Sequence, residues 1–435
     1  MAANQPGIVY GRRVAIVDGL RTPFVKAGTD FKDLSALDLA SGVVGELLQR
    51  SGVAGDRIDQ VVFGAVIPDV GAPNIAREVV LAGDMPDTVD AFSVSRACAT
   101  STQAVVSGAQ SILLGDADIV VAGGAESMSK PPILYSDRFV DILMDANAAK
   151  DIGSKVKAFS ALRPKDLAPN PPAIAERSTA LTMGGSAEIM AKENGISREA
   201  QDEYALRSHQ KAIAAWDNGI FDDEVMAFPV GPDYRATVNK DNIPRADSTL
   251  EKLATLRPVF DRKYGTITAG NSSPLTDGAS AVILMEEKTA ERLGFVPRAF
   301  IRSWAFAALD PNWQLLMGPS FATPIALDKA GLTLDDIDVV DMHEAFAAQI
   351  LSNTQAFASD EWAQRRLGRE QAIGEIPDDS FNLYGGSLSI GHPFGATGAR
   401  QITTMANELA RRNGGRALVT QCAAGGLGAA VVLER

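Results

Sequence analysis

The sequence is poor in the residue types on which most disulfide and metal sites depend. Its 435 residues include 3 histidines and 2 cysteines, Cys98 and Cys422. Two cysteines are too few for a disulfide scaffold or a cysteine-based zinc site. Taken singly, each is most typical of a small buried apolar residue. We therefore expect no metal and no permanently bound cofactor.

Positive charge and long apolar runs are also scarce. The formal net charge is −13, which argues against binding nucleic acid, because that requires lysine and arginine to neutralise phosphates. No apolar run approaches the ~18–20 residues of a membrane span. The first residues, "MAANQPGIVYGRR", lack the apolar region of a secretory signal. We expect a cytoplasmic protein without an integral membrane segment.

What the chain does contain is an alternation of short apolar strands and amphipathic helices. The patterns predict strands at 14–17, 58–67 and 117–127, and a helix at about 35–50. This alternation is typical of a mainly parallel sheet covered by helices.

The pattern occurs twice. Residues 52–65 align without gaps to 331–344, and the strand at 117–124 has a counterpart at 416–423. Either match alone could be chance, but their shared order indicates two similar α/β halves. We predict an N-terminal domain at 10–288 and a C-terminal domain at 289–435.

The stretch 128–252 interrupts the first half as an inserted loop domain. It includes a helix at 197–219 with Ser197 as N-cap. His209 on this helix has the pattern of an exposed residue without a special role. The mixed apolar and acidic segment at 131–146 is interpreted first as loop-domain core, with an acyl tunnel, a partner contact and a membrane contact as alternatives.

Strand, turn and strand are expected over 264–287, where 268–280 forms a candidate ligand loop.

Cys98 lies just before the helical run in "SVSRACATSTQAVVSGAQSILLG" (93–115). The positive end of a helix dipole stabilises a thiolate and can lower the pKa of a thiol placed there. Cys98 is therefore either a nucleophile or a small packed residue at a helix start, and this stretch alone favours neither.

Both cysteines and two of the histidines lie at strand ends or turns rich in small residues. His392 is in "SIGHPFGATGARQI", Cys422 in "LVTQCAAGGLGAAVVLE", and His343 in "DMHEAFAAQI" beside Glu344. Ligands of α/β proteins bind at such places. Glycines there let the backbone approach a ligand closely.

At this point the chain resembles the thiolase family over nearly its whole length. Cys98 before a helix, "GHPFG" at 391–395 and "CAAGGLG" at 422–428 match the motifs of the family. The resemblance implies two βαβαβαββ halves in five-layered α/β/α/β/α packing, with an inserted loop domain.

Two departures from the family pattern indicate a subtype. Many thiolases have asparagine before Glu-Ala-Phe, where this chain has His343, and Asn-x-x-Cys-Ser-Ser-Gly where it has "SRACATS". The residues at these positions resemble those of the β-subunit of the fatty-acid-oxidation trifunctional enzyme, a 3-ketoacyl-CoA thiolase. The resemblance implies a homodimer or homotetramer, and an α-subunit with hydratase and dehydrogenase activities as a further partner.

The resemblance also implies a role for individual residues. Cys98 is expected to be the nucleophile, His392 the base and Cys422 the acid/base that protonates a carbanion. His343 and the backbone N–H of Ala424 are expected to stabilise oxyanions.

Coenzyme A is implied as a substrate, with Ser273 contacting its pantetheine arm. Arg257, Arg262 and Lys263 are candidates for the nucleotide phosphates.

Other functions remain open. An acetoacetyl-CoA thiolase would use the same residues for biosynthetic condensation. A ketoacyl synthase does not need the second thiol, so Cys422 argues against it. A redox or structural protein would pair Cys98 with Cys422 in a disulfide.

Overall fold

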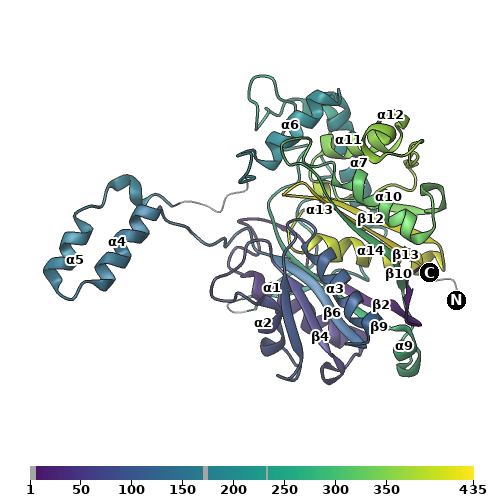
Figure 1. Ribbon diagram of the computed structural model, residues 1–435, viewed down its shortest axis with the longest axis horizontal. Helices are drawn as coiled ribbons and strands as arrows, with labels where there is room; N and C mark the ends of the chain where they lie inside the picture. Colours follow the sequence, from purple (N-terminus) through teal and green to yellow (C-terminus); the bar gives the residue numbers. More distant parts are fainter. Residues whose placement is uncertain (1–5, 170–174, 232–233) are drawn as a thin grey trace.

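One long mixed sheet forms the frame of the protein. The computed structural model describes residues 6–169, 175–231 and 234–435, and it is shown in Figure 1. In spatial order the strands are β11 (Val339–Met342), β12 (Arg416–Ala423), β13 (Leu427–Glu434), β10 (Ala299–Ala308), β2 (Arg12–Arg21), β9 (Thr276–Glu286), β6 (Ile119–Glu126), β4 (Gln60–Gly64) and β5 (Asp90–Val94). Short strands β1 (Ile8–Val9) and β3 (Val25–Lys26) pair with β2 and β9.

The strand order has an internal twofold repeat centred on the antiparallel pair β2 and β10. Outward from β2 come β9, β6 and β4, and outward from β10 come β13, β12 and β11. In each half the first three strands pair antiparallel and the last pair is parallel. The gap-free match of 52–65 to 331–344 therefore places β4 and β11 at corresponding positions, as a duplication predicts.

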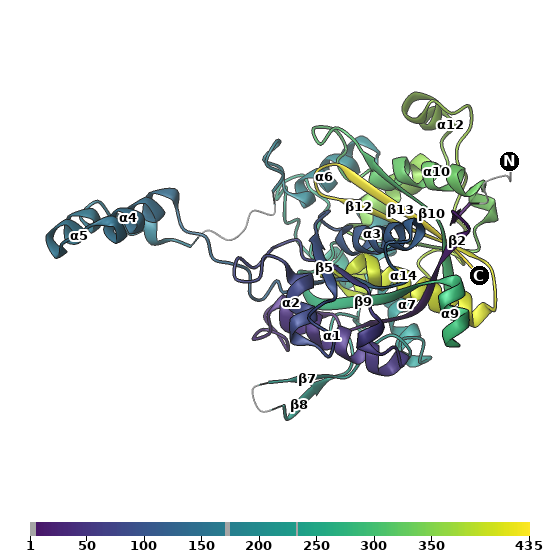
Figure 2. The same ribbon diagram turned by 60° about the horizontal axis from the view of Figure 1, so that its bottom comes forward.

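Helices cover the sheet halves in five layers, which confirms the predicted packing. Helices α3 (Thr100–Leu114) and α14 (Thr397–Arg412) lie in the middle and share one apolar core with both sheet halves. On the outer faces lie α1 (Ala36–Ser51) with α2 (Ile75–Ala82), and α10 (Gly318–Ala330) with α11 (Ala347–Phe357). Figure 2 shows α3 and α14 among the strands.

The alternation of side chains along a strand decides whether each residue packs in the outer or the middle core. Val61 of β4 belongs to the outer core with α1, whereas its neighbour Val62 belongs to the middle core with α3. Successive strand residues point to opposite faces, so a sheet covered on both sides needs continuous apolar runs. This explains the unbroken β-branched pattern in the sequence.

The insertion lies between the antiparallel neighbours β6 and β9, whereas their counterparts β12 and β13 are joined by a tight turn. It contains α4 (Asp137–Ala148), α5 (Ile152–Phe159), α6 (Met183–Glu193), α7 (Arg198–Asp217), β7 (Phe228–Val230), β8 (Ala236–Val238) and α8 (Leu250–Ala254). The remaining helices are α9 (Glu287–Leu293), α12 (Asp360–Trp362) and α13 (Ser387–Ile390).

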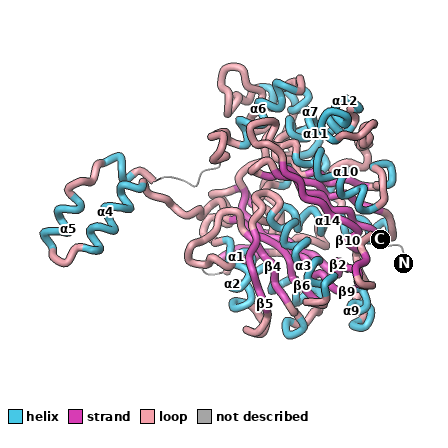
Figure 3. The backbone as a smooth tube through the Cα atoms, viewed as in Figure 1, coloured by secondary structure: helices cyan, strands magenta, loops and turns pink. Residues whose placement is uncertain are grey.

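The segment 131–146 does not form a loop-domain core. Helices α4 and α5 form a hairpin that projects from the body of the molecule (Figures 1 and 3). Ile133 and Met144 are each 65% exposed. The expectation of a core was wrong because an apolar pattern indicates that a helix is amphipathic but not that another element covers it.

Two further expectations need correction. Residues 264–275 form turns instead of a strand, and a strand begins only at Thr276. His209 on α7 is buried, and its Nδ1 accepts a hydrogen bond from the backbone N–H of Arg245. The chain segment that packs over this helix face is remote in sequence, so the helix pattern alone could not reveal it. Across the described residues, the structure contains no helix long and apolar enough to cross a bilayer.

Candidate active site

Cys98 lies on a strained turn that leads into α3. Ala97 has a positive φ of 45°, although it is not glycine, and α3 begins at Thr100 with Ala99 as N-cap. Such strain persists where the surrounding structure imposes it, often at functional sites. The side chain of Cys98 is half-buried. The expected position of the thiol at a helix start is therefore correct.

His392 lies in the loop between α13 and α14, with its ring buried. Its Nδ1 is 2.7 Å from Oγ1 of Thr397, whose hydroxyl donates to the carbonyl of Pro393. With the hydroxyl proton given to Pro393, we assign the ring proton to Nδ1, which then donates to Thr397. Nε2 is left with a lone pair, as a base requires.

Close backbone packing holds this loop. A Cβ on Gly395 would lie 2.4 Å from the carbonyl oxygen of Ala125 at the end of β6, and Gly391 has a φ of +109°. Only glycine tolerates both conditions readily. The glycines around His392 thus dock the loop on β6.

His343 follows β11 directly and faces His392. Their ring centroids are 4.1 Å apart. Nδ1 of His343 is hydrogen-bonded to Oγ of Ser387 on α13 at 2.8 Å. Burial, with the neighbouring His392 and the positive charge of Arg400 as smaller causes, holds the pKa of His343 well below its usual range. The ring is therefore neutral at physiological pH.

Cys422 is fully buried near the end of β12, opposite Gly428 of β13. Burial raises its pKa well above that of an ordinary thiol, and the nearby Cys98 raises it further. Just beyond β12, the backbone N–H of Ala424 acts to lower the pKa of the Cys98 thiol, as does the backbone N–H of Cys98 itself. The β12–β13 turn therefore supplies a donor directed at the thiol.

The structure thus brings together the residues that the sequence singled out from three distant segments. The sulfur of Cys98 and one nitrogen each of His343 and His392 lie within 4.8 Å of one another. Burial, and secondarily Arg400, lowers the pKa of His392 to about 3. Both cysteines are free, with no disulfide between them in the part of the chain that is described.

The resting Cys98 is a thiol, not a thiolate. Burial raises its pKa to about 11, with a smaller upward contribution from the charge of Glu126, although the N–H groups of Ala424 and Cys98 act in the opposite direction. The effect of burial therefore outweighs the lowering of the pKa that was expected at the helix start. For this sulfur to attack another molecule, a nearby base would have to accept its proton.

This protonation state predicts the pH dependence of alkylation. Because the raised pKa keeps Cys98 protonated, its reaction with iodoacetamide should accelerate about tenfold per unit from about pH 7 to pH 10, with no plateau. Cys422 is fully buried and should react more slowly, which peptide mass spectrometry can check. A plateau near neutral pH would contradict the protonated resting state.

A cavity of about 610 Å³ lies beside the segment that carries His392. Leu275 lines it and forms a β-bridge with His392. Its lining combines apolar side chains with Ser273 and the exposed Arg245 and Lys252. The cavity can hold an elongated ligand with one charged end near solvent.

Of the proposed phosphate contacts, none lines this cavity: Arg257, Arg262 and Lys263, all of them described, lie outside it. The cationic residues that do line the cavity are Lys26, Arg245 and Lys252, which come from separate segments.

Two buried glutamates position the site and were not predicted as functional. Glu126 accepts hydrogen bonds from the backbone N–H groups of Val66, Ile67 and Gly395, each at 3.0 Å. This ties the His392 loop to the first half. Burial raises the pKa of Glu126 to about 7. Its position at a strand end was the only sequence signal.

Glu344 has the same kind of role on the other side. Its carboxylate accepts from Tyr204, Ser208, Asn382 and the backbone N–H of Leu388. It therefore fastens α7 of the insertion to the segments that carry both histidines.

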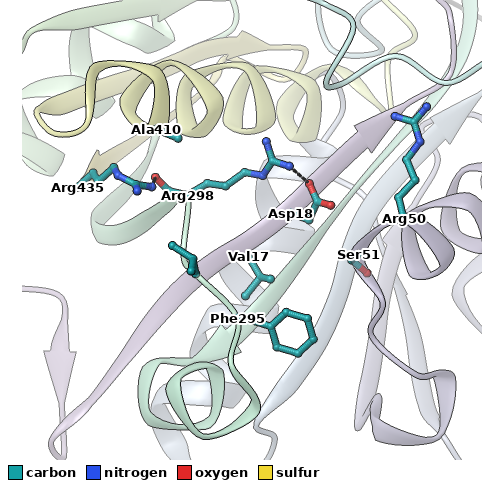
Figure 4. A pocket seen from close by; sticks show the side chains of 9 residues that line it. Val17, Asp18, Arg50, Ser51, Phe295, Arg298, Ala410 and Arg435 are labelled. Carbon is teal, nitrogen blue, oxygen red and sulfur yellow. Dashed lines mark hydrogen bonds and ion pairs between the residues drawn. The ribbon is translucent and has the colours of Figure 1, made fainter.

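A separate cavity of about 370 Å³ lies remote from these residues (Figure 4). Its arginines are already engaged: Arg298 pairs with Asp18, and Arg50 pairs with Glu46. It contains none of the chemistry gathered around Cys98.

Comparisons with known proteins agree with this geometry. The model "Thiolase, N-terminal domain" matches residues 14–288, and "Thiolase, C-terminal domain" matches 295–435. A 3-ketoacyl-CoA thiolase of Yersinia pestis (strain Pestoides F) is 55% identical over 424 residues, covering 98% of this chain and 97% of the relative.

Solved structures are similar over the whole chain. The acetyl-CoA acetyltransferase of Bacillus anthracis has a TM-score of 0.84 at 32% identity, covering 99% of this chain and 100% of that one. Human mitochondrial 3-ketoacyl-CoA thiolase in complex with CoA has a TM-score of 0.82 at 31% identity, with 99% of each chain covered.

Proposed function

The chain belongs to the thiolase family, and we propose that it cleaves 3-ketoacyl-CoA with CoA through an acyl-enzyme formed on Cys98. The products are acetyl-CoA and an acyl-CoA two carbons shorter, the cleavage step of fatty-acid β-oxidation. The observation that carries the residue assignment is the convergence of Cys98, His343 and His392 within 4.8 Å, beside a second free thiol.

In the first half-reaction the Cys98 sulfur attacks the 3-keto carbon while its proton passes to the Nε2 lone pair of His392. The backbone N–H groups of Cys98 and Ala424 stabilise the tetrahedral oxyanion. The bond between C2 and C3 then breaks, and its electron pair leaves as the enolate of acetyl-CoA. The Cys422 thiol protonates C2 of this enolate.

The enolate oxygen also needs donors. Nε2 of His392, once protonated, provides one, and His343 provides another. Each such donor contributes on the order of 10²–10³ to turnover. Both rings are neutral at rest because burial lowers the pKa of each histidine.

In the second half-reaction CoA enters and loses its thiol proton to the Cys422 thiolate. The CoA sulfur attacks the acyl-Cys98 thioester, and the leaving Cys98 sulfur recovers its proton from His392. The protonation states of Cys98, His392 and Cys422 are then restored, and the kinetics are ping-pong. The chain's own groups complete both half-reactions.

We place CoA in the 610 Å³ cavity, with the pantetheine arm along Ser273 and the phosphates at Arg245 and Lys252. The support is the lining, which combines the hydroxyl of Ser273 and apolar walls with the exposed Arg245 and with Lys252, which is paired with Asp247. These cations match the negative charge of the nucleotide on a chain whose overall net charge is −13.

The double variant Arg245→Ala/Lys252→Ala should raise KM for CoA about fivefold, because exposed ion pairs contribute up to about 1 kcal/mol each. The kcat value should change little, since neither residue contacts the reacting atoms. The matched control is Arg262→Ala/Lys263→Ala, which removes the same charge outside the cavity. Equal effects of the two double variants would contradict this placement.

The direct test of the activity is the loss of 3-ketoacyl-CoA as a function of chain length, for wild type and Cys98→Ser. Cleavage of medium and long chains is the expected result. Activity confined to acetoacetyl-CoA would favour the biosynthetic alternative, and no cleavage at any length would refute the proposal. Reversible Cys98–Cys422 pairing that controls function would favour a redox role.

We further propose that the chain assembles as a homodimer or homotetramer and with a hydratase/dehydrogenase α-subunit. The projecting α4–α5 hairpin supports an additional partner, because its exposed apolar residues have no cover within the described chain. Co-purification from the native source should recover the α-subunit. Recovery of the homo-oligomer alone would contradict this.

Both thiols must stay reduced for this chemistry, so we propose the reducing cytoplasm as the compartment. We also propose the division into domains at 10–288 and 289–435. The twofold strand order about β2 and β10 supports it.

A further inference from the structure

The three residues around the nucleophile offer the donor set of a metal site. Thiolate sulfur and imidazole nitrogen are the ligands that Zn²⁺ prefers in proteins. Here one sulfur and two nitrogens lie within 4.8 Å, with Cys98 half-buried and both histidines buried. In a tetrahedral zinc site such atoms are about 3.5 Å apart. Binding would therefore draw the three side chains closer together by on the order of 1 Å.

Both imidazoles present an unused nitrogen. Among the described residues, Nε2 of His343 and Nε2 of His392 have no hydrogen-bond partner, although each is buried. A buried nitrogen without a partner is costly, and it indicates a place for a ligand. The Nδ1 atoms are held by Ser387 and Thr397, and hydroxyls at this position orient metal-binding histidines.

The local charges permit a cation. Arg400 is the positive side chain that acts on both histidines, but it is buried in an ion pair with Asp341 at 2.7 Å. The charge of Glu126, in turn, acts on the Cys98 thiol. A bound ion would therefore not face an unbalanced positive charge.

We propose that Cys98, His343 and His392 form an inhibitory binding site for Zn²⁺. The ion takes the Cys98 sulfur and the two Nε2 atoms, the thiol proton is released to solvent, and a fourth position stays open for water or the thiol of CoA. The occupied site holds the nucleophile and the base together and removes both from reaction with substrate.

Metal binding itself does not depend on the proposed reaction, whereas the inhibition rests on Cys98 being its nucleophile. The two must therefore be measured apart. A direct binding readout tests the site, and protection of Cys98 tests whether the ion covers the thiol.

The binding experiment titrates the intact reduced protein with Co²⁺, which substitutes for Zn²⁺ and absorbs light. We expect one ion per chain, a sulfur-to-cobalt charge-transfer band, and displacement of Co²⁺ by Zn²⁺. Zn²⁺ should also block alkylation of Cys98 by iodoacetamide, and a chelator should restore it. The wild type alone can refute the site: absence of the charge-transfer band would overturn the proposal, whatever the variants do.

Variants then identify the ligands. His343→Asn should weaken Co²⁺ binding by at least about 10–100-fold. Cys98→Ser should abolish the charge-transfer band. The matched control is His209→Asn, which removes the third histidine of the chain and should leave binding unchanged. Equal binding by His343→Asn and wild type would overturn the assignment of ligands.

Discussion

Replacing Cys98 with alanine should reduce thiolysis by on the order of 10⁴–10⁶, because loss of a covalent nucleophile removes the acyl-enzyme route altogether. No other sulfur can take its place: Cys422 is fully buried and its pKa is raised further above the normal range. The measurement is the initial rate of 3-ketoacyl-CoA loss at saturating CoA.

The control for this variant is its fold. Cys98 is small and half-buried, so Cys98→Ala should melt within a few degrees of wild type. CoA should still bind, because the cavity is lined by other residues. Wild-type turnover by a folded Cys98→Ala protein would show that Cys98 is not the nucleophile.

Replacing Cys422 with serine should lower thiolysis by about 10²–10⁴, the usual contribution of a positioned acid or base. Serine matches cysteine closely in size at this fully buried position, so packing is kept while the proton donor becomes far weaker. The specific readout is exchange of the C2 protons of acetyl-CoA with deuterated water, which the thiolate of Cys422 promotes. This exchange should fall by the same factor.

The experiment is decisive because the Cys422→Ser substitution should affect proton exchange but not the reactivity of Cys98. In Cys422→Ser, Cys98 should still be alkylated by iodoacetamide at close to the wild-type rate. Proton exchange at the wild-type rate would show that another group acts on C2, and His392 would then be the first alternative.

The sequence predicts this fold well because the relevant signals are local. A continuous apolar run bounded by small residues identifies β6 and β12, and the match of 52–65 to 331–344 places β4 and β11 in equivalent positions. Cys98, His392 and Cys422 could be singled out as candidates because each lies next to the end of a helix or strand, within a recognisable motif.

What the sequence could not predict depends on contacts between remote segments. Glu126 acts on the site by accepting a hydrogen bond from the backbone N–H of Gly395, and nothing in the sequence around either residue indicates this contact. The pKa of Cys98 was expected to fall at a helix start, yet burial raises it to about 11. Arg245 lines the 610 Å³ cavity from a segment outside the ligand motif.

The central claim is a covalent acyl-Cys98 intermediate, and mass spectrometry of the trapped enzyme tests it most directly. Wild-type protein is mixed with a 3-ketoacyl-CoA in the absence of free CoA, quenched in acid and digested. The account predicts an acyl group two carbons shorter than the substrate on the peptide that contains Cys98, and its removal when CoA is added before the quench. An acyl group on the Cys422 peptide, or substrate cleavage without any acylated peptide, would contradict it.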